Sequence, residues 1–336
     1  ALTKRRIVVT GLGLLSPLGN SVATSWDGIV AGRSGIGMIT RFDTSAFPAR
    51  IFGTIKDFKP EEYLPPKEAR RVDPFMQYGV AAGVQAIRDS GLAIDDGNRE
   101  RIGVVFGAGI GGMQTIEDNT AKYLEAQSPR KISPLFIPSS IINMISGHLS
   151  ILFGIHGPNL AVVTACTTST HAIGLAMRAI QHCAADVMVA GGAEMAETPP
   201  SVGAFCQAKA VSTRNDDPAR ASRPWDRDRD GFVMAEGAGG MVLEEYEHAR
   251  ARGARIYAEL VGFGMSGDAY HITAPPADGD GARRSMLNAL RDAGCNPGDV
   301  DYINAHATST ELGDVAETTA IKRAFGDHAR ELAVSS

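Results

Sequence analysis

The sequence has little cysteine, no long apolar run and no excess of basic charge. Four of the 336 residues are cysteine and none forms a Cys-x-x-Cys pair, so we expect neither a disulfide framework nor a metal site. No apolar stretch reaches the length of a membrane span. A formal charge of −5 argues against a generic binder of nucleic acid or membrane surfaces. We therefore expect a cytoplasmic protein that binds neither nucleic acid nor membrane.

Short apolar runs alternate with longer helical patterns, which is typical of an α/β fold. Hydrophobic residues make up 44% of the chain, enough for a sizeable core. The apolar runs predict strands at residues 6–10, 102–106, 160–164, 186–190, 240–244, 258–263 and 302–305. The helical patterns predict helices at residues 22–31, 74–90, 139–153, 169–182, 279–293 and 314–325.

A weak internal repeat is visible at two predicted helix ends. Ala-Ile-Arg-Asp-Ser-Gly at residues 86–91 and Ala-Leu-Arg-Asp-Ala-Gly at residues 289–294 each precede a loop and a predicted strand. Both segments indicate a helix that ends at a glycine. The repeat is consistent with a duplicated α/β unit, and chance similarity of two helix ends is the alternative.

Cys166 is the strongest candidate for a reactive residue. It follows a run of β-formers that ends at Thr164, and a helical pattern begins just after it. At such a turn unpaired N–H groups and the helix dipole favour an anion, and cysteines there have pKa values of roughly 3.5–7.5. Cys166 is thus a candidate nucleophile, although many cysteines are simply small core residues.

His306 is a second candidate, because it comes directly after the predicted strand at residues 302–305. Functional groups of α/β folds gather at strand carboxyl ends. His306 could be a base or hydrogen-bond donor beside Cys166, or a structural cap of the strand. The glycines at residues 11–13 also follow a predicted strand, but they lack the full dinucleotide-binding pattern. Those at residues 107–112 lack the Lys-Ser/Thr of a phosphate loop and indicate a tight turn.

Seven motifs in this order make the chain similar to the β-ketoacyl-[acyl-carrier-protein] synthases, the type II condensing enzymes of bacterial fatty acid synthesis. They are residues 9–13 (VTGLG), 109–112 (GIGG), 164–167 (TACT), 190–194 (AGGAE), 222–226 (SRPWD), 230–232 (DGF) and 304–306 (NAH). The resemblance implies a thiolase-like fold of αβαβα layers in two duplicated halves, usually as a homodimer. It implies an N-terminal half at residues 1–254 with the nucleophile, and the start of a C-terminal half at 255–336.

The resemblance also implies roles for individual residues. Cys166 matches the nucleophile that takes the acyl chain, and His306 matches a histidine that assists malonyl decarboxylation. Thr308 and Thr310 match hydroxyls that contact the phosphopantetheine arm, and Glu317 matches a supporting acid. The residues that line or gate the acyl pocket are matched by Ile110 and Phe205. Basic positions that dock the acidic carrier protein are matched by Lys67, Arg70, Arg71, Arg130, Lys131 and Lys209.

The resemblance predicts a decarboxylative condensation of an acyl thioester with malonyl-carrier, without a metal or resident cofactor. Only the carrier's own phosphopantetheine arm is needed. A thiolase or a polyketide-type synthase is the alternative enzyme, and a chain-length partner subunit is the non-catalytic one, which Cys166 argues against. Two departures stand out: Ala307 replaces the family's glycine, and the family's second histidine and a lysine would follow Ser336. We therefore expect a truncated C-terminal half.

Overall fold

The computed structural model describes residues 4–336, which group into two compact units. The first unit comprises residues 4–35, Gly53–Ser201 and Ala235–Leu260. The second comprises Ile36–Phe52, Val202–Met234 and Val261–Ser336. The domain boundary expected after residue 254 stays a prediction, because the units group residues by contact and not by duplicated halves.

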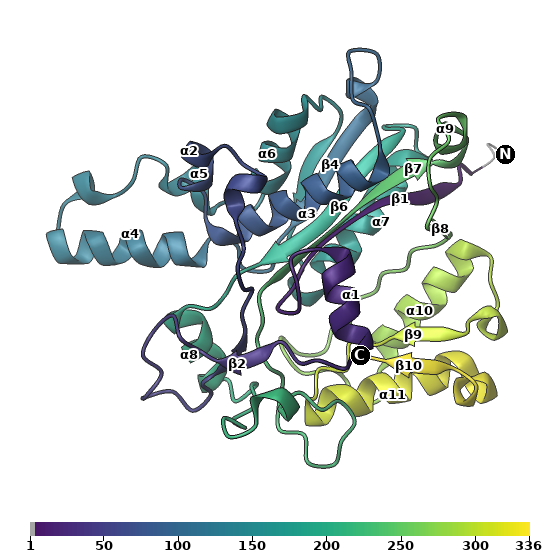
Figure 1. Ribbon diagram of the computed structural model, residues 1–336. Coiled ribbons are helices and arrows are strands. Elements are labelled where there is room, and N and C mark those ends of the chain that lie inside the picture. Colours follow the sequence, from purple (N-terminus) through teal and green to yellow (C-terminus); the bar gives the residue numbers. More distant parts are fainter. Residues whose placement is uncertain (1–3) are drawn as a thin grey trace. The chain divides into compact units, whose positions relative to one another are not determined.

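Strands and helices alternate along most of the chain (Figure 1). The strands are β1 (Ile7–Leu15), β2 (Ile36–Met38), β3 (Ile51–Gly53), β4 (Ile102–Gly107), β5 (Asn159–Val162), β6 (Val187–Glu194), β7 (Gly237–Glu245), β8 (Ala258–Leu260), β9 (Tyr302–Asn304) and β10 (Ala333–Ser335). The helices are α1 (Val22–Val30), α2 (Pro66–Ala69), α3 (Pro74–Ser90), α4 (Met113–Ala126), α5 (Phe136–Ser140), α6 (Met144–Phe153), α7 (Thr168–Gln181), α8 (Pro199–Gln207), α9 (Tyr246–Ala251), α10 (Asp280–Ala293) and α11 (Glu311–Phe325).

The first unit is built on a six-stranded sheet in the order β5-β4-β6-β7-β1-β8. β4 runs parallel to β5 and β6, whereas β7 is antiparallel to both β6 and β1. Helix α3 packs on β1, β6 and β7, and α7 packs on β4 and β6. The sheet is thus covered by helices, which explains the continuous apolar runs of β4 and β6.

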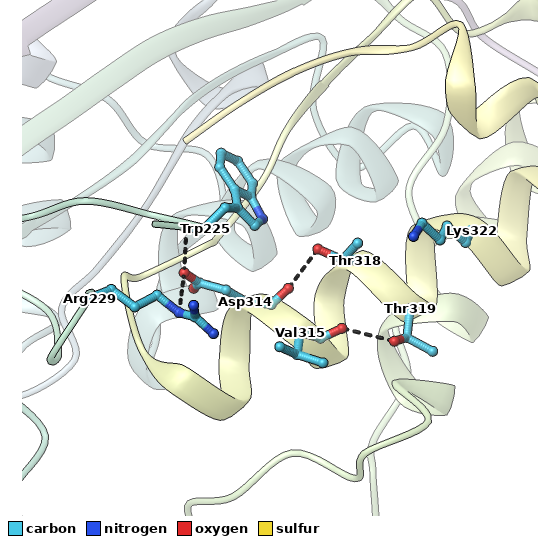
Figure 2. Close-up of a pocket in the computed structure, with 7 residues that line it drawn as sticks. All are labelled: Trp225, Arg229, Asp314, Val315, Thr318, Thr319 and Lys322. Atoms are coloured by element: carbon cyan, nitrogen blue, oxygen red, sulfur yellow. Dashed lines mark hydrogen bonds and ion pairs between the residues drawn. The ribbon is translucent and has the colours of Figure 1, made fainter. Parts of the chain in front are cut away.

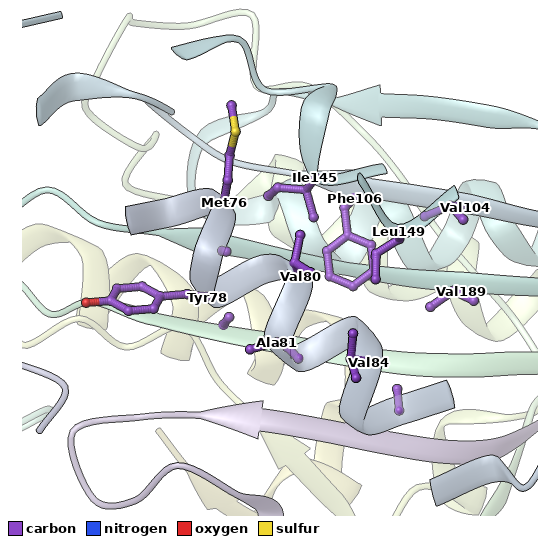
Figure 3. Packing of buried hydrophobic residues seen from close by; sticks show 14 of the residues in the cluster. Met76, Tyr78, Val80, Ala81, Val84, Val104, Phe106, Ile145, Leu149 and Val189 are labelled. Carbon is purple, nitrogen blue, oxygen red and sulfur yellow. The ribbon is translucent and has the colours of Figure 1, made fainter. Parts of the chain in front are cut away.

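The main core of this unit lies between α3, α6 and the sheet (Figure 3). Asp73 caps the start of α3 and Gly91, in the left-handed conformation, ends it. Between them the helix presents small and apolar residues to the sheet. Phe106 of β4 and Ile145 and Leu149 of α6 are fully buried against that helix. This core holds the strands that carry the candidate site.

Strand β1 is longer than predicted, because it runs through the glycines at residues 11–13 instead of ending before them. A Cβ atom on Gly11 would lie 2.1 Å from the Ala86 carbonyl oxygen, and one on Gly13 would lie 2.0 Å from that of Ala82. These glycines therefore allow α3 to pack closely on the strand. The predicted end of the strand at residue 10 was therefore wrong.

The predicted helix at residues 139–153 is confirmed from Met144 to Phe153 as α6, but its predicted start is wrong, because residues 139 and 140 end the separate helix α5. Ile141 takes an extended conformation between them. The Ser140 carbonyl accepts a hydrogen bond from the Gly112 amide at 3.1 Å. The loop after β4 thus interrupts the helix, a tertiary contact that helical periodicity does not reveal.

The second unit repeats the packing seen between β1 and α3. A Cβ atom on Gly262 would lie 2.5 Å from the Ala289 carbonyl oxygen of α10, and one on Gly264 would lie 2.2 Å from that of Ser285. In the first unit the Leu12 amide donates to Asp89 at 2.9 Å, and in the second the Phe263 amide donates to Asp292 at 2.9 Å. Asp89 and Asp292 are the equivalent aspartates of the two repeat segments. This shared geometry agrees with the predicted duplication.

Helices α10 and α11 and the parallel pair β9–β10 form the rest of this packing in the second unit. Phe325 of α11 is buried in a small core that also contains Leu287 and Leu290 of α10 and Ile303 of β9. Across the described residues, 4–336, no helix is both long enough and apolar enough to cross a membrane.

Candidate active site

Three parallel strands bring the candidate residues of the first unit to one edge of the sheet. Val162 of β5 pairs with Gly107 of β4, which in turn pairs with Gly192 of β6. The carboxyl ends of the three strands therefore lie side by side. Cys166, Ile110 and Glu194 follow these aligned positions by two to four residues. Such an edge is where open α/β sheets place functional groups.

Cys166 lies in a short 3-10 turn, Ala165–Thr167, directly before α7. The predicted strand-to-helix turn is confirmed. Ala165 has a φ of 51°, in the left-handed region that side chains other than glycine rarely adopt. The thiol is exposed and sits before the first turn of α7, where N–H groups and the helix dipole favour a thiolate.

Hydroxyl groups hold this turn in place. The Thr164 amide donates to Thr168 Oγ1 at 2.9 Å, and Thr167 Oγ1 donates to the Thr164 carbonyl at 2.8 Å. His171 Nδ1 lies 2.7 Å from Thr164 Oγ1. The strain at Ala165 is thus supported by three side chains around it, as expected for a backbone fixed for function.

Ile110 lies on the loop between β4 and α4, beside the cysteine turn. A Cβ atom on Gly109 would be 3.6 Å from Ala165 Cα, so the two loops are in close contact. The Ile110 side chain is 37% exposed. The structure therefore brings together Cys166 and Ile110, which the sequence placed 56 residues apart.

Two carboxylates that sequence reasoning did not single out hold this loop. Glu194 accepts hydrogen bonds from the backbone of Gly109 and its two successors, and Asp73 accepts one from the Thr115 amide at 2.9 Å. Burial raises the pKa of both carboxyl groups, and the backbone N–H groups oppose that rise. Glu194 is the last residue of the AGGAE motif at residues 190–194, and that motif was the sequence signal that could have identified it. Asp73 has the pattern of an ordinary helix cap.

His306 lies two residues after β9 in the second unit, as predicted, and its side chain is exposed. The carboxylate of Glu317 on α11 accepts its backbone N–H at 2.8 Å and that of Ala307 at 2.7 Å. Ser336 Oγ donates to the Ala307 carbonyl at 2.8 Å. Glu317 is therefore placed to hold the histidine loop through its backbone.

Thr308 and Thr310 lie on the same loop, and their hydroxyl oxygens are 3.2 Å apart. Ala307 has a φ of 20° and Ser309 a φ of 68°. Glycine would adopt such values freely, so alanine at 307 costs about 1 kcal/mol. His306, the two threonines and Glu317 are thus brought together within this unit.

A network around Asp314 supports the far side of this loop (Figure 2). The buried Asp314 carboxylate accepts from the Ser309 amide at 3.1 Å and the Trp225 amide at 2.8 Å, and it pairs with Arg229 at 3.2 Å. The Arg229 guanidinium also donates to the Thr310 carbonyl. A pocket of about 220 Å³ adjoins them, lined by Trp225, Arg229, Asp314, Val315, Thr318, Thr319 and Lys322. The hydroxyls of Thr318 and Thr319 in this pocket donate to backbone carbonyls of their own helix, α11. The network around Asp314 therefore mainly supports the loop.

Phe205 and Lys209 also belong to the second unit. Phe205 on α8 packs edge-on against Phe232, with ring centroids 5.4 Å apart. Lys209 is exposed just beyond α8 and has a φ of 53°. Their predicted roles, as pocket wall and carrier contact, remain expectations.

The other predicted basic residues lie in two short segments of the first unit. One segment contains α2 and the residues after it, and the other is a 3-10 turn, Pro129–Lys131. Ser139 of α5 donates to the Arg71 carbonyl, so α5 lies beside the segment that contains α2 (Figure 1). Within residues 4–336 none of the five forms an ion pair, and all are exposed: Lys67, Arg70, Arg71, Arg130 and Lys131.

The described part of the chain contains no group of three His, Cys, Asp or Glu side chains that could hold a metal ion.

Comparison with known proteins gives a consistent result. Residues 4–249 match the family model for the N-terminal domain of beta-ketoacyl synthase, and residues 257–336 match the model for its C-terminal domain. The chain is 57% identical over 326 residues to 3-oxoacyl-[acyl-carrier-protein] synthase 2 of Vibrio cholerae, covering 97% of this chain and 78% of that protein.

Two solved structures are similar in fold. A beta-ketoacyl synthase from Burkholderia phymatum has a TM-score of 0.87 and 35% identity, with 96% of this chain and 78% of that one covered. A ketosynthase solved in complex with its type II PKS acyl-carrier protein has a TM-score of 0.89 and 32% identity, with 99% and 80% covered. The predicted fold class is confirmed.

Proposed function

This chain belongs to the β-ketoacyl synthase family, and on that ground we propose that it performs the decarboxylative Claisen condensation of fatty acid elongation. The substrates are an acyl thioester and malonyl-acyl-carrier-protein, and the product is a β-ketoacyl-carrier-protein. The observation that carries the proposal is the exposed Cys166 thiol in a strained turn at the start of α7.

Acyl transfer comes first. The Cys166 thiolate attacks the acyl thioester carbonyl, a Cys–S–acyl bond forms, the old C–S bond breaks, and the carrier's pantetheine leaves as its thiolate. We assign to the backbone N–H of Cys166 a hydrogen bond that stabilises the oxyanion of the tetrahedral intermediate. No resident cofactor enters this step, because the carrier supplies the thioester.

Condensation follows. Malonyl-carrier loses CO2, and the electron pair left on its α-carbon attacks the acyl–Cys166 carbonyl, which releases the thiolate. We assign to His306 a hydrogen bond to the malonyl thioester oxygen, which stabilises the enolate as CO2 leaves. Thr308 and Thr310 contact the pantetheine arm, and Ile110 and Phe205 border the acyl chain.

Sequence identity supports a condensing enzyme of fatty acid elongation over one of polyketide synthesis. The chain is 57% identical to the Vibrio cholerae synthase but 32% identical to the polyketide ketosynthase. The complex of that ketosynthase with its carrier supports a carrier protein as partner here. The exposed basic residues on α2 and the turn Pro129–Lys131 supply positive charge for an acidic carrier.

We also propose a homodimer through β5. This strand lies at an edge of the sheet, and its Leu160 is 37% exposed, with Val163 just beyond it 56% exposed. An apolar edge strand is normally covered, and a second copy of β5 pairs with it readily. Sedimentation should give a dimer that a Leu160→Lys variant weakens. A monomeric parent protein would contradict this.

The cytoplasmic location stays a prediction.

His306→Ala tests the reaction. The variant should still form acyl–Cys166, because the thiol is untouched, but it should release little CO2 from malonyl-carrier. Undiminished CO2 release would contradict the role of His306. Condensation with acetyl-CoA and without CO2 release would instead indicate a thiolase.

A further inference from the structure

The Glu194 carboxylate binds three consecutive backbone N–H groups of the loop that carries Ile110. Its Oε2 accepts from Gly109 at 2.7 Å and Ile110 at 2.8 Å, and its Oε1 accepts from Gly111 at 3.1 Å. Successive N–H groups that converge in this way form a concave anion-binding turn. Here the anion is a side chain of the protein, supplied by the end of β6.

These bonds determine where the Ile110 backbone lies. The loop follows β4, which pairs with β6, so the Glu194 side chain has a short, fixed reach from one strand end to the loop after its neighbour. Gly109 contacts the cysteine turn, since a Cβ atom there would be 3.6 Å from Ala165 Cα. The distance between the Ile110 side chain and the cysteine turn is therefore coupled to the carboxylate of Glu194.

Asp73 holds the other end of the same segment, through the Thr115 amide at 2.9 Å. It also accepts from the Phe75 amide as the cap of α3, which is part of the core. Asp73 thus anchors the start of α4, and Glu194 anchors the residues closest to Cys166. Of these two carboxylates, Glu194 is the one that accepts a hydrogen bond from Ile110 itself.

We propose that Glu194 is a positioning residue that determines acyl-chain length by fixing the Ile110 loop beside Cys166. The proposal rests on the proposed function, because it requires that Ile110 borders the acyl chain. A loop held by three hydrogen bonds keeps its side chain against a long acyl chain. A loosened loop gives way, so longer chains enter more readily.

Glu194→Gln tests this with little change in size. A single amide oxygen cannot occupy both acceptor positions, so at least one N–H faces an NH2 group. Loss of a hydrogen bond to a charged acceptor corresponds to about tenfold or more in an equilibrium. We expect kcat/KM for acylation of Cys166 by a sixteen-carbon acyl-carrier, relative to a four-carbon one, to rise by about tenfold in this variant.

A double-mutant cycle with Ile110→Ala separates positioning from general damage. If Glu194 acts through Ile110, the chain-length ratio should respond to Glu194→Gln in the parent but not in the Ile110→Ala background. Glu125→Gln, on the exposed surface of α4, is the matched control and should leave the ratio unchanged. An equal response in both backgrounds would overturn the proposal.

The outcomes distinguish this proposal from the proposed function. A parent enzyme that never acylates Cys166 contradicts the function itself. A parent that acylates normally, with an unchanged ratio in Glu194→Gln, contradicts only the role of Glu194. Should Glu194→Gln not fold, Glu194→Asp keeps the charge but withdraws it by one methylene. It should raise the same ratio, and an unchanged ratio would again refute the proposal.

Discussion

Removing the Glu317 carboxylate should impair decarboxylation without preventing acyl transfer. Glu317 accepts the backbone N–H groups of His306 at 2.8 Å and Ala307 at 2.7 Å. Its side chain extends from α11 to the loop that carries His306. In Glu317→Ala both N–H groups lose their acceptor, and the loop loses its attachment to the helix.

The two lost bonds differ in cost. Ala307 is buried, so its N–H is left without an acceptor at a cost of about 1–3 kcal/mol. His306 is exposed, so water replaces the carboxylate and the net loss is about 0.5–1.5 kcal/mol. The sum is about 1.5–4.5 kcal/mol, which corresponds to roughly a ten- to thousandfold loss of the active loop arrangement, at 1.4 kcal/mol per factor of ten.

The assay compares two half-reactions in the same preparation. The rate of CO2 release from malonyl-carrier should decrease by roughly ten- to thousandfold in Glu317→Ala. Acylation of Cys166, in the other unit, should keep its parent rate. Glu311→Ala, an exposed glutamate in the first turn of α11, is the control and should change neither. Parent-level CO2 release in Glu317→Ala would refute the reasoning, as would an equal loss in both half-reactions.

Three further predictions concern other parts of the molecule. Limiting iodoacetamide should label Cys166 before the other three cysteines, as peptide mapping would show, and an unlabelled Cys166 would contradict its assignment. Lys67→Glu combined with Arg71→Glu should raise KM for acyl-carrier but not for small acyl thioesters, with steep salt dependence in the parent; equal losses on both substrates would indicate a structural patch. Hydrogen bonds from Arg101 and then Arg5 lower the pKa of Asp186 from 3.8 to about 2. Because the folded-state pKa is lowered, Asp186 stabilises the protein above pH 3.8 and loses that contribution as pH falls toward 2, so urea unfolding should show the Asp186→Asn deficit shrink over that range.

The sequence alone determined the local features of the fold. Alternating apolar runs and helical periodicity predicted the positions of β4, β9, α3 and α7, because local propensity and burial follow side-chain pattern. The turn that places Cys166 before a helix followed from the same reasoning. The family resemblance then linked Cys166 to His306, which no local pattern connects.

The tertiary structure decided what depends on contacts distant in sequence. The glycines of β1 extend the strand past its predicted end because α3 packs closely on them. The helix predicted at residues 139–153 starts later because the loop after β4 bonds to the Ser140 carbonyl. Glu194 gained its role in the same way, since three N–H groups lie more than 80 positions away along the chain. Periodicity records which residues are buried, whereas a hydrogen bond between two strand ends depends on which strands are neighbours. Strand order is set by packing of the whole sheet, so these groups meet only in the folded chain.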